Sequence, residues 1–434
     1  MAMVQGMRIA HFIQRYPPAL GGSEAYFARL SRFLAAAGDQ VTVFTTTALD
    51  LSAFWSRRGR CLSPGACIED GVEVRRYQPS FRFPGRRYLL KPLSMLPWLS
   101  MKRMLMPCSP MPWRMWTDAA GLRCAFDIVH ASAFPYSWPL ACGLRLARRL
   151  RVPFALTPFM HMGDPEDPRD RTRREYTSQA LISLARAADL VFVQTDAEYG
   201  AMRDAGVAPE CLCLAGLGVD RQECTGGDRR RARSTWGVRI DETVVGHLAN
   251  NSQEKGTVDL LLAANEAWRR GHRFVVVLAG PEMPNFARFW RTFEPRGQVV
   301  RLGMLDDVQK RDFFAGLDLF ALPSRSDSFG LVLLEAWTNG VPNIVYRAGG
   351  PAEVVRHEID GLIVRCGDVS ALAGALVRLI GNPWLRHALG QAGCARIEPD
   401  FGWDDKLTAV RVAYQKAIGK EQPVARPSLL ADEG

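Results

Sequence analysis

The most informative stretch of the sequence is Pro323-Ser-Arg-Ser-Asp327-Ser-Phe-Gly330-Leu-Val-Leu-Leu-Glu335-Ala-Trp-Thr-Asn-Gly340-Val-Pro342. A short apolar segment, residues 317–322, precedes it and ends at a proline, which is typical of a parallel strand buried on both faces. A helix is predicted from about residue 329 to residue 339, because Gly340 and Pro342 supply a stop signal. The stretch therefore predicts a strand, a loop and a helix, with Asp327 in the loop and Glu335 roughly two turns along the helix.

This junction suits an anionic ligand. The first turn of a helix has backbone N–H groups without intrahelical partners, and Gly330 lets a ligand approach the backbone closely. A diphosphate would fit there. The alternative interpretation is an ordinary strand–helix unit in which Asp327 is solvated and Glu335 acts only as a cap.

The length and composition predict a globular protein of two domains. The chain has 434 residues, of which 47% are hydrophobic and 23% are charged, and domains of about 200 residues are common. Residues 221–240 are polar and rich in glycine and arginine, so we expect them to be an interdomain linker. The predicted domains are residues 1–220 and 241–400, and we expect residues 419–434 to be a disordered tail.

Apolar runs alternate with helical patterns along almost the whole chain, which is typical of repeated strand–helix–strand units on parallel sheets. The predicted fold class is therefore α/β with two parallel sheets. Strands of the first sheet are expected at residues 7–13, 41–45, 72–77, 127–130, 154–158 and 190–194. Strands of the second sheet are expected at residues 244–248, 274–279, 299–302, 317–322, 343–346 and 362–364.

The charge balance favours phosphate-bearing or membrane partners. The formal net charge is +10, nearly all of it from arginine, because only seven lysines occur. No helix-turn-helix, zinc-finger or RNA-binding aromatic pattern accompanies the charge, so no nucleic-acid partner is expected. No signal-peptide pattern precedes the first strand, and no stretch approaches the roughly 18 apolar residues of a membrane-spanning helix. We expect a cytoplasmic protein, with peripheral association to the inner face of the plasma membrane as a further expectation.

A set of short motifs occurs in a fixed order along the chain. They are Gly21-Gly22-Ser-Glu, Pro158-Phe-Met-His161, Lys255-Gly256, Gly303, Pro323-Ser, Asp327 followed by Glu335-Ala, Gly340-x-Pro342 and Gly349-Gly350-Pro-Ala-Glu353. Their order and spacing resemble the family 4 glycosyltransferases over almost the whole chain, up to about residue 418. The resemblance implies the GT-B architecture, in which two Rossmann-like domains with parallel sheets face each other across a cleft.

The same resemblance implies a function. It implies retaining transfer of a sugar from a nucleoside-diphosphate donor, without an obligate metal, so no cofactor is expected. Residues 1–220 would bind the acceptor, residues 241–400 would bind the donor, and a helix at 401–418 would cross back to the N-terminal domain. No side-chain nucleophile is assigned, because retention in this family is usually explained by front-face attack.

Lys255 is the candidate for the positive charge that a diphosphate leaving group requires. It precedes Gly256 at a predicted helix start, where its ammonium can reach a phosphate. The alternative is a solvated lysine at a helix start. Two other residues are expected to have catalytic roles. The resemblance implies that Asp327 contacts sugar hydroxyls, and His161 would bond a sugar hydroxyl or carry a proton.

The remaining site residues follow from the resemblance. Glu335 would accept hydrogen bonds from the donor ribose, and the loop at Gly303 and Met304 would lie by the nucleobase. The full set of expected donor-binding residues is Gly21, Gly22, His247, Lys255, Gly303, Met304, Asp327, Phe329, Gly330, Leu331 and Glu335.

Two positions depart from the family pattern. Asp327 stands where the family usually has glutamate, and Gly246-His247-Leu248 stands where Gly-Arg-Leu is common. His247 could replace an arginine at a phosphate only when protonated or as a neutral donor. These departures leave open a catalytically impaired nucleotide-sugar-binding or scaffold protein. A nucleotide-sugar epimerase is a further alternative, because such enzymes can share the architecture.

Residues 81–116 form a basic and aromatic segment within a predicted insertion at residues 78–120. Arginine and lysine among tryptophan, leucine and methionine indicate a surface that contacts an anionic membrane. The alternative is an insertion packed on the N-terminal domain with its arginines outward. A membrane surface would suit a glycan or lipid-linked sugar acceptor in cell-envelope or exopolysaccharide synthesis.

Overall fold

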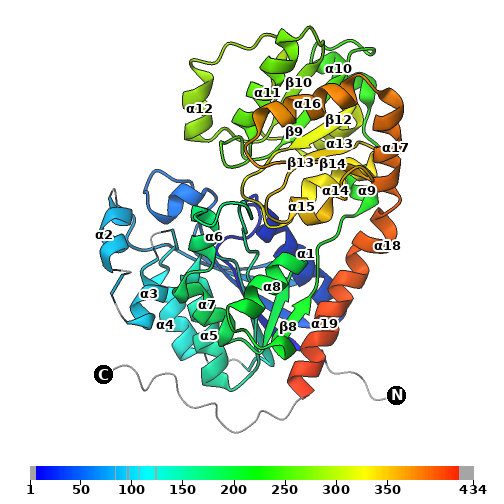
Figure 1. Cartoon of the computed structure of the whole chain (residues 1–434). Helices are drawn as coiled ribbons and strands as arrows, with labels where there is room; N and C mark the ends of the chain where they lie inside the picture. The colour runs from blue at the N-terminus through cyan, green and yellow to red at the C-terminus, as the bar shows by residue number, and fades with distance from the viewer. Residues whose placement is uncertain are drawn as a thin grey trace, which may run out of the picture. The chain divides into compact units, whose positions relative to one another are not determined.

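The computed structural model describes residues 6–83, 85–93, 95–96, 98–106, 108–122 and 125–419. These residues divide into two compact units (Figure 1). The first unit contains the described residues within Met1–Met160, Glu175–Ala215 and Leu407–Gly434, and the second contains His161–Arg174 and Gly216–Lys406.

The first unit is built on an eight-stranded sheet with the order β3-β4-β2-β1-β5-β6-β7-β8. All neighbouring strands are parallel except β3, which is antiparallel to β4. The strands are β1 (Arg8–Phe12), β2 (Gln40–Thr46), β3 (Gly65–Glu69), β4 (Val72–Tyr77), β5 (Ile128–Ser132), β6 (Phe154–Thr157), β7 (Leu190–Val193) and β8 (Leu212–Leu214). The helices that begin in this unit are α1 (Gly22–Ala36), α2 (Arg86–Leu93), α3 (Leu99–Met104), α4 (Trp113–Gly121), α5 (Ser137–Leu150), α7 (Gln179–Arg186) and α8 (Asp196–Asp204), with short 3-10 turns at Leu51–Phe54 and Pro209–Cys211. Sequence order reverses between β1 and β5.

Helix α19 (Trp403–Gly419) begins in the second unit and ends in the first. Its Arg411 forms an ion pair of 2.7 Å with Asp39, and the hydroxyl of Tyr414 is bonded to Nδ1 of His130. Burial lowers the pKa of His130 well below its usual range and lowers the pKa of His11, beside it, to about 3. Both imidazoles are therefore neutral and belong to the core of the first unit.

The second unit contains a six-stranded parallel sheet with the order β11-β10-β9-β12-β13-β14. The strands are β9 (Val244–Leu248), β10 (Val275–Ala279), β11 (Val299–Arg301), β12 (Leu319–Leu322), β13 (Asn343–Tyr346) and β14 (Gly361–Val364). Counted from β9, this is the order 3-2-1-4-5-6 of a doubly wound Rossmann-like sheet. Such sheets bind ligands outside the carboxyl ends of the strands where the order reverses, which here is between β9 and β12.

Helices cover both faces of the second sheet. Successive side chains of β12 point to opposite faces, and each set packs against a different group of helices. Leu319 and Ala321 join the core cluster that includes Leu260 of α11 (Thr257–Arg269) and Leu372 of α16 (Val369–Ile380). The Phe320 ring lies against Phe314 of α13 (Asp307–Gly316). Besides α19, the helices that begin in this unit are α6 (Arg171–Tyr176), α9 (Arg221–Cys224), α10 (Arg229–Thr235), α11 (Thr257–Arg269), α12 (Pro284–Trp290), α13 (Asp307–Gly316), α14 (Leu331–Thr338), α15 (Pro351–Val354), α16 (Val369–Ile380), α17 (Pro383–Cys394) and α18 (Ile397–Phe401). The predicted α/β class with two Rossmann-like, largely parallel sheets is confirmed.

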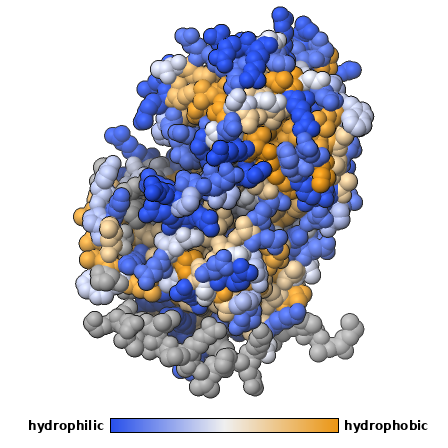
Figure 2. Space-filling view, viewed as in Figure 1, coloured by the Kyte–Doolittle hydropathy of each residue, from blue (hydrophilic) through white to orange (hydrophobic). Residues whose placement is uncertain are grey.

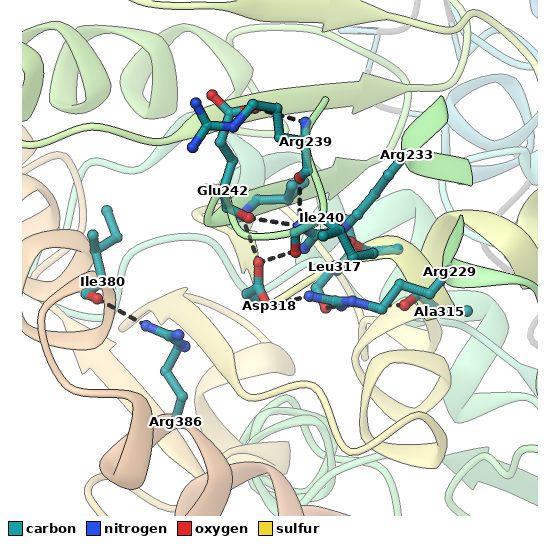
Figure 3. A network of polar contacts seen from close by, with 12 residues as sticks. Arg229, Arg233, Arg239, Ile240, Glu242, Ala315, Leu317, Asp318, Ile380 and Arg386 are labelled. Atoms are coloured by element: carbon teal, nitrogen blue, oxygen red, sulfur yellow. Dashed lines mark hydrogen bonds and ion pairs between the residues drawn. The ribbon is translucent and has the colours of Figure 1, made fainter. Parts of the chain in front are cut away.

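Residues 221–240, which we expected to be a linker, instead form α9 and α10 of the second unit. The buried Arg233 donates hydrogen bonds to the carbonyls of Gly316, Ile240 and Glu242 and forms an ion pair of 2.6 Å with Asp318 (Figure 3). Arginine-rich composition made this segment resemble a solvated linker, but the buried Arg233 instead holds it against the rest of the second unit. Gly419 belongs to α19, and residues 420–434 of the expected tail lie outside the described residues.

The segment at residues 81–116 exposes apolar side chains, but several of its arginines turn inward. Tyr88 of α2 is 85% exposed and Met95 is 75% exposed. Arg82 donates to the carbonyls of Ser56 and Gly59, Arg86 is buried against Phe54 and Ser109 carbonyls, and Arg103 bonds Ser183. Hydrophobic residues reach the surface on the side of the first unit where α2 and α3 lie (Figure 2).

Within the described ranges, no helix combines the length and the apolar character that are needed to cross a bilayer.

Candidate active site

Two loops meet at the point of the second sheet where the strand order reverses. One joins β9 to α11 and carries Lys255, and the other joins β12 to α14 and carries Asp327. The loops pack tightly because Gly256 has a φ of 76° and a Cβ there would lie 1.8 Å from the carbonyl oxygen of Pro323. Lys255 Nζ lies 2.7 Å from Asp327 Oδ2 and donates to the Ser326 carbonyl at 2.8 Å. The structure therefore brings these two predicted site residues into direct contact.

The pair is partly buried and keeps Asp327 ionised. Burial alone would raise the pKa of Asp327, but the Lys255 charge, His161 and a hydrogen bond from the Phe329 N–H lower it below its usual value. Asp327 is thus a carboxylate acceptor at neutral pH, suited to the hydroxyl groups of a ligand. Lys255 supplies a preorganised positive charge beside it.

His161 belongs to the second unit, although we expected it to act from the N-terminal domain. Residues 161–174 are held there by a hydrogen bond of 3.0 Å from the Gly349 N–H to the Gly163 carbonyl. His161 Nδ1 lies 2.7 Å from Ser326 Oγ. Burial, followed by the Lys255 charge, lowers the pKa of His161 to about 4, against the opposing effect of Asp327. The imidazole is therefore neutral near pH 7, and it can hydrogen-bond a ligand without carrying a charge.

Helix α14 begins in tightly packed backbone, where a Cβ at Gly330 would lie 2.9 Å from a side-chain carbon of Leu333. Gly330 has a φ of 85° and precedes the first helical residue, Leu331. The Phe329 ring is buried and packs against Phe401, so Phe329 can contact a donor only through its backbone. A Cβ at Gly350 would lie 2.0 Å from the Ser328 carbonyl oxygen, so this glycine lets the loop after β13 pack against the loop before α14.

Glu335 lies further along α14 and is paired with a residue that we did not predict. Its Oε1 lies 2.6 Å from Nζ of Lys310 on α13. Its Oε2 is buried and has no hydrogen-bond partner in the described part of the chain. Burial alone would lower the pKa of Lys310, but Glu335 raises it above its usual value. Lys310 could have been found as one of only seven lysines in a chain that otherwise uses arginine.

His247 does not occupy the position of a phosphate ligand, in contrast to our prediction. The imidazole is fully buried, with Nδ1 2.8 Å from the Ala321 carbonyl and Nε2 2.9 Å from the Thr257 hydroxyl. A carbonyl can only accept, so Nδ1 carries the proton and Nε2 accepts from Thr257. Burial lowers the pKa of His247 to about 4, so the ring is neutral. Thr257 Oγ1 also accepts from the Ser252 N–H, and His247 thus supports the Lys255 loop from inside.

The other predicted residues lie far along the chain from the Lys255–Asp327 pair, Gly303 and Met304 in the second unit and Gly21 and Gly22 in the first. Gly303 has a φ of 70° and, with the exposed Met304, follows β11 on the carboxyl edge of the second sheet. Gly21 and Gly22 follow β1 in the first unit. A Cβ at Gly21 would lie 2.2 Å from the carboxylate of Glu24, so the first glycine makes room for that buried side chain.

The described residues contain no group of three or more His, Cys, Asp or Glu side chains that could hold a metal ion. The expectation that no metal is needed stays a prediction.

Two Rossmann-like units in one chain are the architecture of GT-B proteins, and the Lys255–Asp327 pair lies where the strand order of the second unit reverses. The sequence matches the family described as glycosyl transferase 4-like domain over residues 21–218 and that described as glycosyl transferases group 1 over residues 228–396. The chain belongs to the group 1 glycosyltransferases, as its motifs predicted.

Similar proteins support the fold. The D-inositol 3-phosphate glycosyltransferase of Mycobacterium tuberculosis H37Rv is 31% identical over 268 residues, covering 59% of this chain and 54% of the relative. The chain thus spans about half the length of the curated relatives it matches. Among solved structures, sucrose-phosphate synthase from Thermosynechococcus elongatus has a TM-score of 0.70 at 20% identity, covering 94% of this chain and 98% of that one. Anabaena HepE in complex with UDP-glucose has a TM-score of 0.66 at 19% identity, covering 94% and 100%.

Proposed function

We propose that this protein transfers a sugar from a nucleoside-diphosphate sugar to a glycan or lipid-linked acceptor, with retention of configuration. The observation that carries the proposal is the Lys255–Asp327 pair, with Glu335 on the helix that follows. The diphosphate would bind Lys255 and the N–H groups at the start of α14, and Asp327 would accept hydrogen bonds from the sugar. Glu335 Oε2, which is buried without a partner in the described chain, would accept one from the ribose.

The proposed reaction needs no side-chain nucleophile. The bond between the anomeric carbon and the phosphate oxygen breaks while the acceptor oxygen bonds that carbon on the same face. The proton of the acceptor hydroxyl passes to the leaving phosphate. Lys255 stabilises the charge that develops on this phosphate, and the neutral His161 beside Ser326 positions a hydroxyl group.

The comparisons suggest which donors to test first. HepE, which has a similar fold, is described in complex with UDP and with UDP-glucose, and Arabidopsis starch synthase IV is described with ADP bound. Because proteins of this fold are described with a nucleotide bound, nucleoside-diphosphate donors are tested first, and the base is left to experiment. The acceptor of the mycobacterial relatives, as their name states, is an inositol phosphate.

A donor panel tests the proposal. We expect UDP-glucose, GDP-mannose or ADP-glucose to raise the melting temperature, with one nucleotide class dominant. A donor at 100 times its Kd stabilises the folded state by about 2.7 kcal/mol. Glu335→Ala should lose most of this stabilisation, whereas Lys416→Ala on α19 should keep it. The proposal is overturned if no donor shifts the melting temperature of the wild-type protein.

We also propose that residues 81–116 dock on an anionic membrane, which would bring a lipid-linked acceptor to the enzyme. Exposed apolar side chains of this segment, including Tyr88 and Met95, are accompanied by the exposed basic residues Lys91 and Arg114. Amphipathic surfaces of this kind insert their apolar side chains among lipid head groups and attract anionic lipids electrostatically.

Sedimentation with lipid vesicles tests this membrane contact. Vesicles containing phosphatidylglycerol should bind the protein, and vesicles of phosphatidylcholine alone should bind it weakly. Replacing Tyr88 and Met95 by serine should weaken binding about tenfold or more, because a buried side chain of this size contributes about 1.5–3 kcal/mol. Trp384→Ser, which changes an exposed apolar residue of α17, is the matched control and should have no effect. Equal binding of the double variant and the wild type would contradict the proposal.

A further inference from the structure

Lys310 and Glu335 are held in place by the helices that carry them. Helix α13 begins with a capping box, in which Asp306 accepts from the Gln309 N–H at 2.8 Å and the Gln309 side chain accepts from the Asp306 N–H. Helix α14 is fixed by the buried Trp337, whose Nε1 donates to the Asp360 carbonyl at 2.9 Å. The ion pair between these helices therefore joins two rigid elements.

The two oxygens of the Glu335 carboxylate have different environments. Oε1 accepts from Lys310 at 2.6 Å, and the side chain is only 14% exposed. Oε2 is buried without a hydrogen-bond donor in the described residues, which is unfavourable for a carboxylate oxygen. A donor supplied by a ligand would complete its hydrogen bonding.

The neighbouring groups do not supply that donor. Cys224 of α9 lies near the pair, and burial, followed by the Glu335 charge, raises the pKa of its thiol to about 12. The thiol therefore keeps its proton, but it makes no hydrogen bond to Oε2 among the described residues. Glu223 and Asp220 lie near Cys224, and Asp307 lies near Lys310, so the remaining charged groups around the pair are acidic.

The charge of the pair selects the chemistry of the ligand group. Lys310 balances Glu335, so the position does not attract a phosphate as Lys255 does. The open acceptor at Oε2 instead suits a neutral hydroxyl donor, and a ribose carries two adjacent hydroxyls. A deoxyribose lacks one of these hydroxyls, so a deoxyribonucleoside diphosphate would leave Glu335 Oε2 without a hydrogen-bond donor.

We propose that Lys310 is a positioning residue that holds Glu335 by one oxygen and aims the other at a ribose hydroxyl, so that the site selects ribonucleoside over deoxyribonucleoside diphosphates. This inference rests on the proposed function, because it assumes that a nucleotide binds the second unit. It adds a specificity determinant that lies on a different helix from Glu335.

Titration calorimetry of the full chain tests the inference. UDP, GDP and ADP are titrated first, and the diphosphate that binds is compared with its 2′-deoxy and 3′-deoxy forms. At least one deoxy form should bind the wild type about 10–100-fold more weakly, as expected for loss of a hydrogen bond to a charged group. Lys310→Met should weaken binding of the ribonucleotide about tenfold and reduce the preference over that deoxy form to less than about threefold. Lys310→Arg should restore most of the preference, and Lys416→Met should behave as the wild type.

The outcomes separate the inference from the proposed function. If UDP, GDP and ADP all fail to bind the wild type, the proposed function fails and the inference fails with it. If the wild type binds a diphosphate but Lys310→Met keeps the full ribose preference, Lys310 has only a structural role and the inference alone is overturned. Circular dichroism checks folding, and Lys310→Gln replaces the methionine variant if that variant unfolds.

Discussion

Replacing Lys255 with methionine is expected to lower kcat/KM for the donor by roughly 10²–10³-fold, the usual effect of removing one group that stabilises transition-state charge. The leaving diphosphate gains negative charge as the glycosidic bond breaks. Lys255 Nζ already lies in a partly buried position, held by Asp327 and the Ser326 carbonyl, so it requires little reorganisation to meet that charge. Release of nucleoside diphosphate from the donor measures the rate.

The Lys255 prediction has matched controls. Asp327→Asn keeps the size of the side chain and removes the charge that holds the ammonium, and it should lower the rate with Lys255 still present. Lys416→Met on α19 removes a lysine elsewhere and should leave the rate unchanged. A rate for Lys255→Met within about threefold of the wild type would favour the alternative, in which Lys255 is a solvated residue at a helix start.

The sequence predicts the second sheet well because its strands are buried on both faces and therefore appear as continuous apolar runs. The site loops are predictable for a second local reason. Gly256 and Gly330 both have positive φ values directly before a helix, which glycine adopts without strain. Local chain chemistry thus places Lys255 and Asp327 at neighbouring loops.

Other parts of the site depend on contacts between residues far apart in the sequence, which local patterns do not encode. Lys310 meets Glu335 across 25 positions, and Arg233 meets Asp318 across 85. The sequence shows that His247 stands where arginine is common, but not that its two ring nitrogens already bond Ala321 and Thr257. Residues 161–174 follow a strand of the first sheet yet pack in the second unit.

Replacing Arg233 with methionine is expected to destabilise the second unit by about 3–5 kcal/mol, the usual cost of removing one partner from a buried ion pair. The Arg233 side chain is 1% exposed. Its guanidinium satisfies the Gly316, Arg239, Ile240 and Glu242 carbonyls as well as the Asp318 carboxylate (Figure 3). Methionine fills similar space but donates nothing, so these acceptors lose their donor where water cannot easily replace it.

Arg229 offers a matched control because it binds the other oxygen of Asp318, at 2.7 Å, from a side chain that is 38% exposed. Arg229→Met should cost less than Arg233→Met, because Arg229 is more exposed and water can reach Asp318 and the Leu317 carbonyl when its guanidinium is removed. Amide hydrogen exchange in peptides from β9 and β12 measures the stability of the second unit separately from the first. If Arg233→Met exchanged no faster than Arg229→Met, the buried contacts of Arg233 would not stabilise the second unit. Residues 221–240 would then behave as the loosely held linker that their composition indicates.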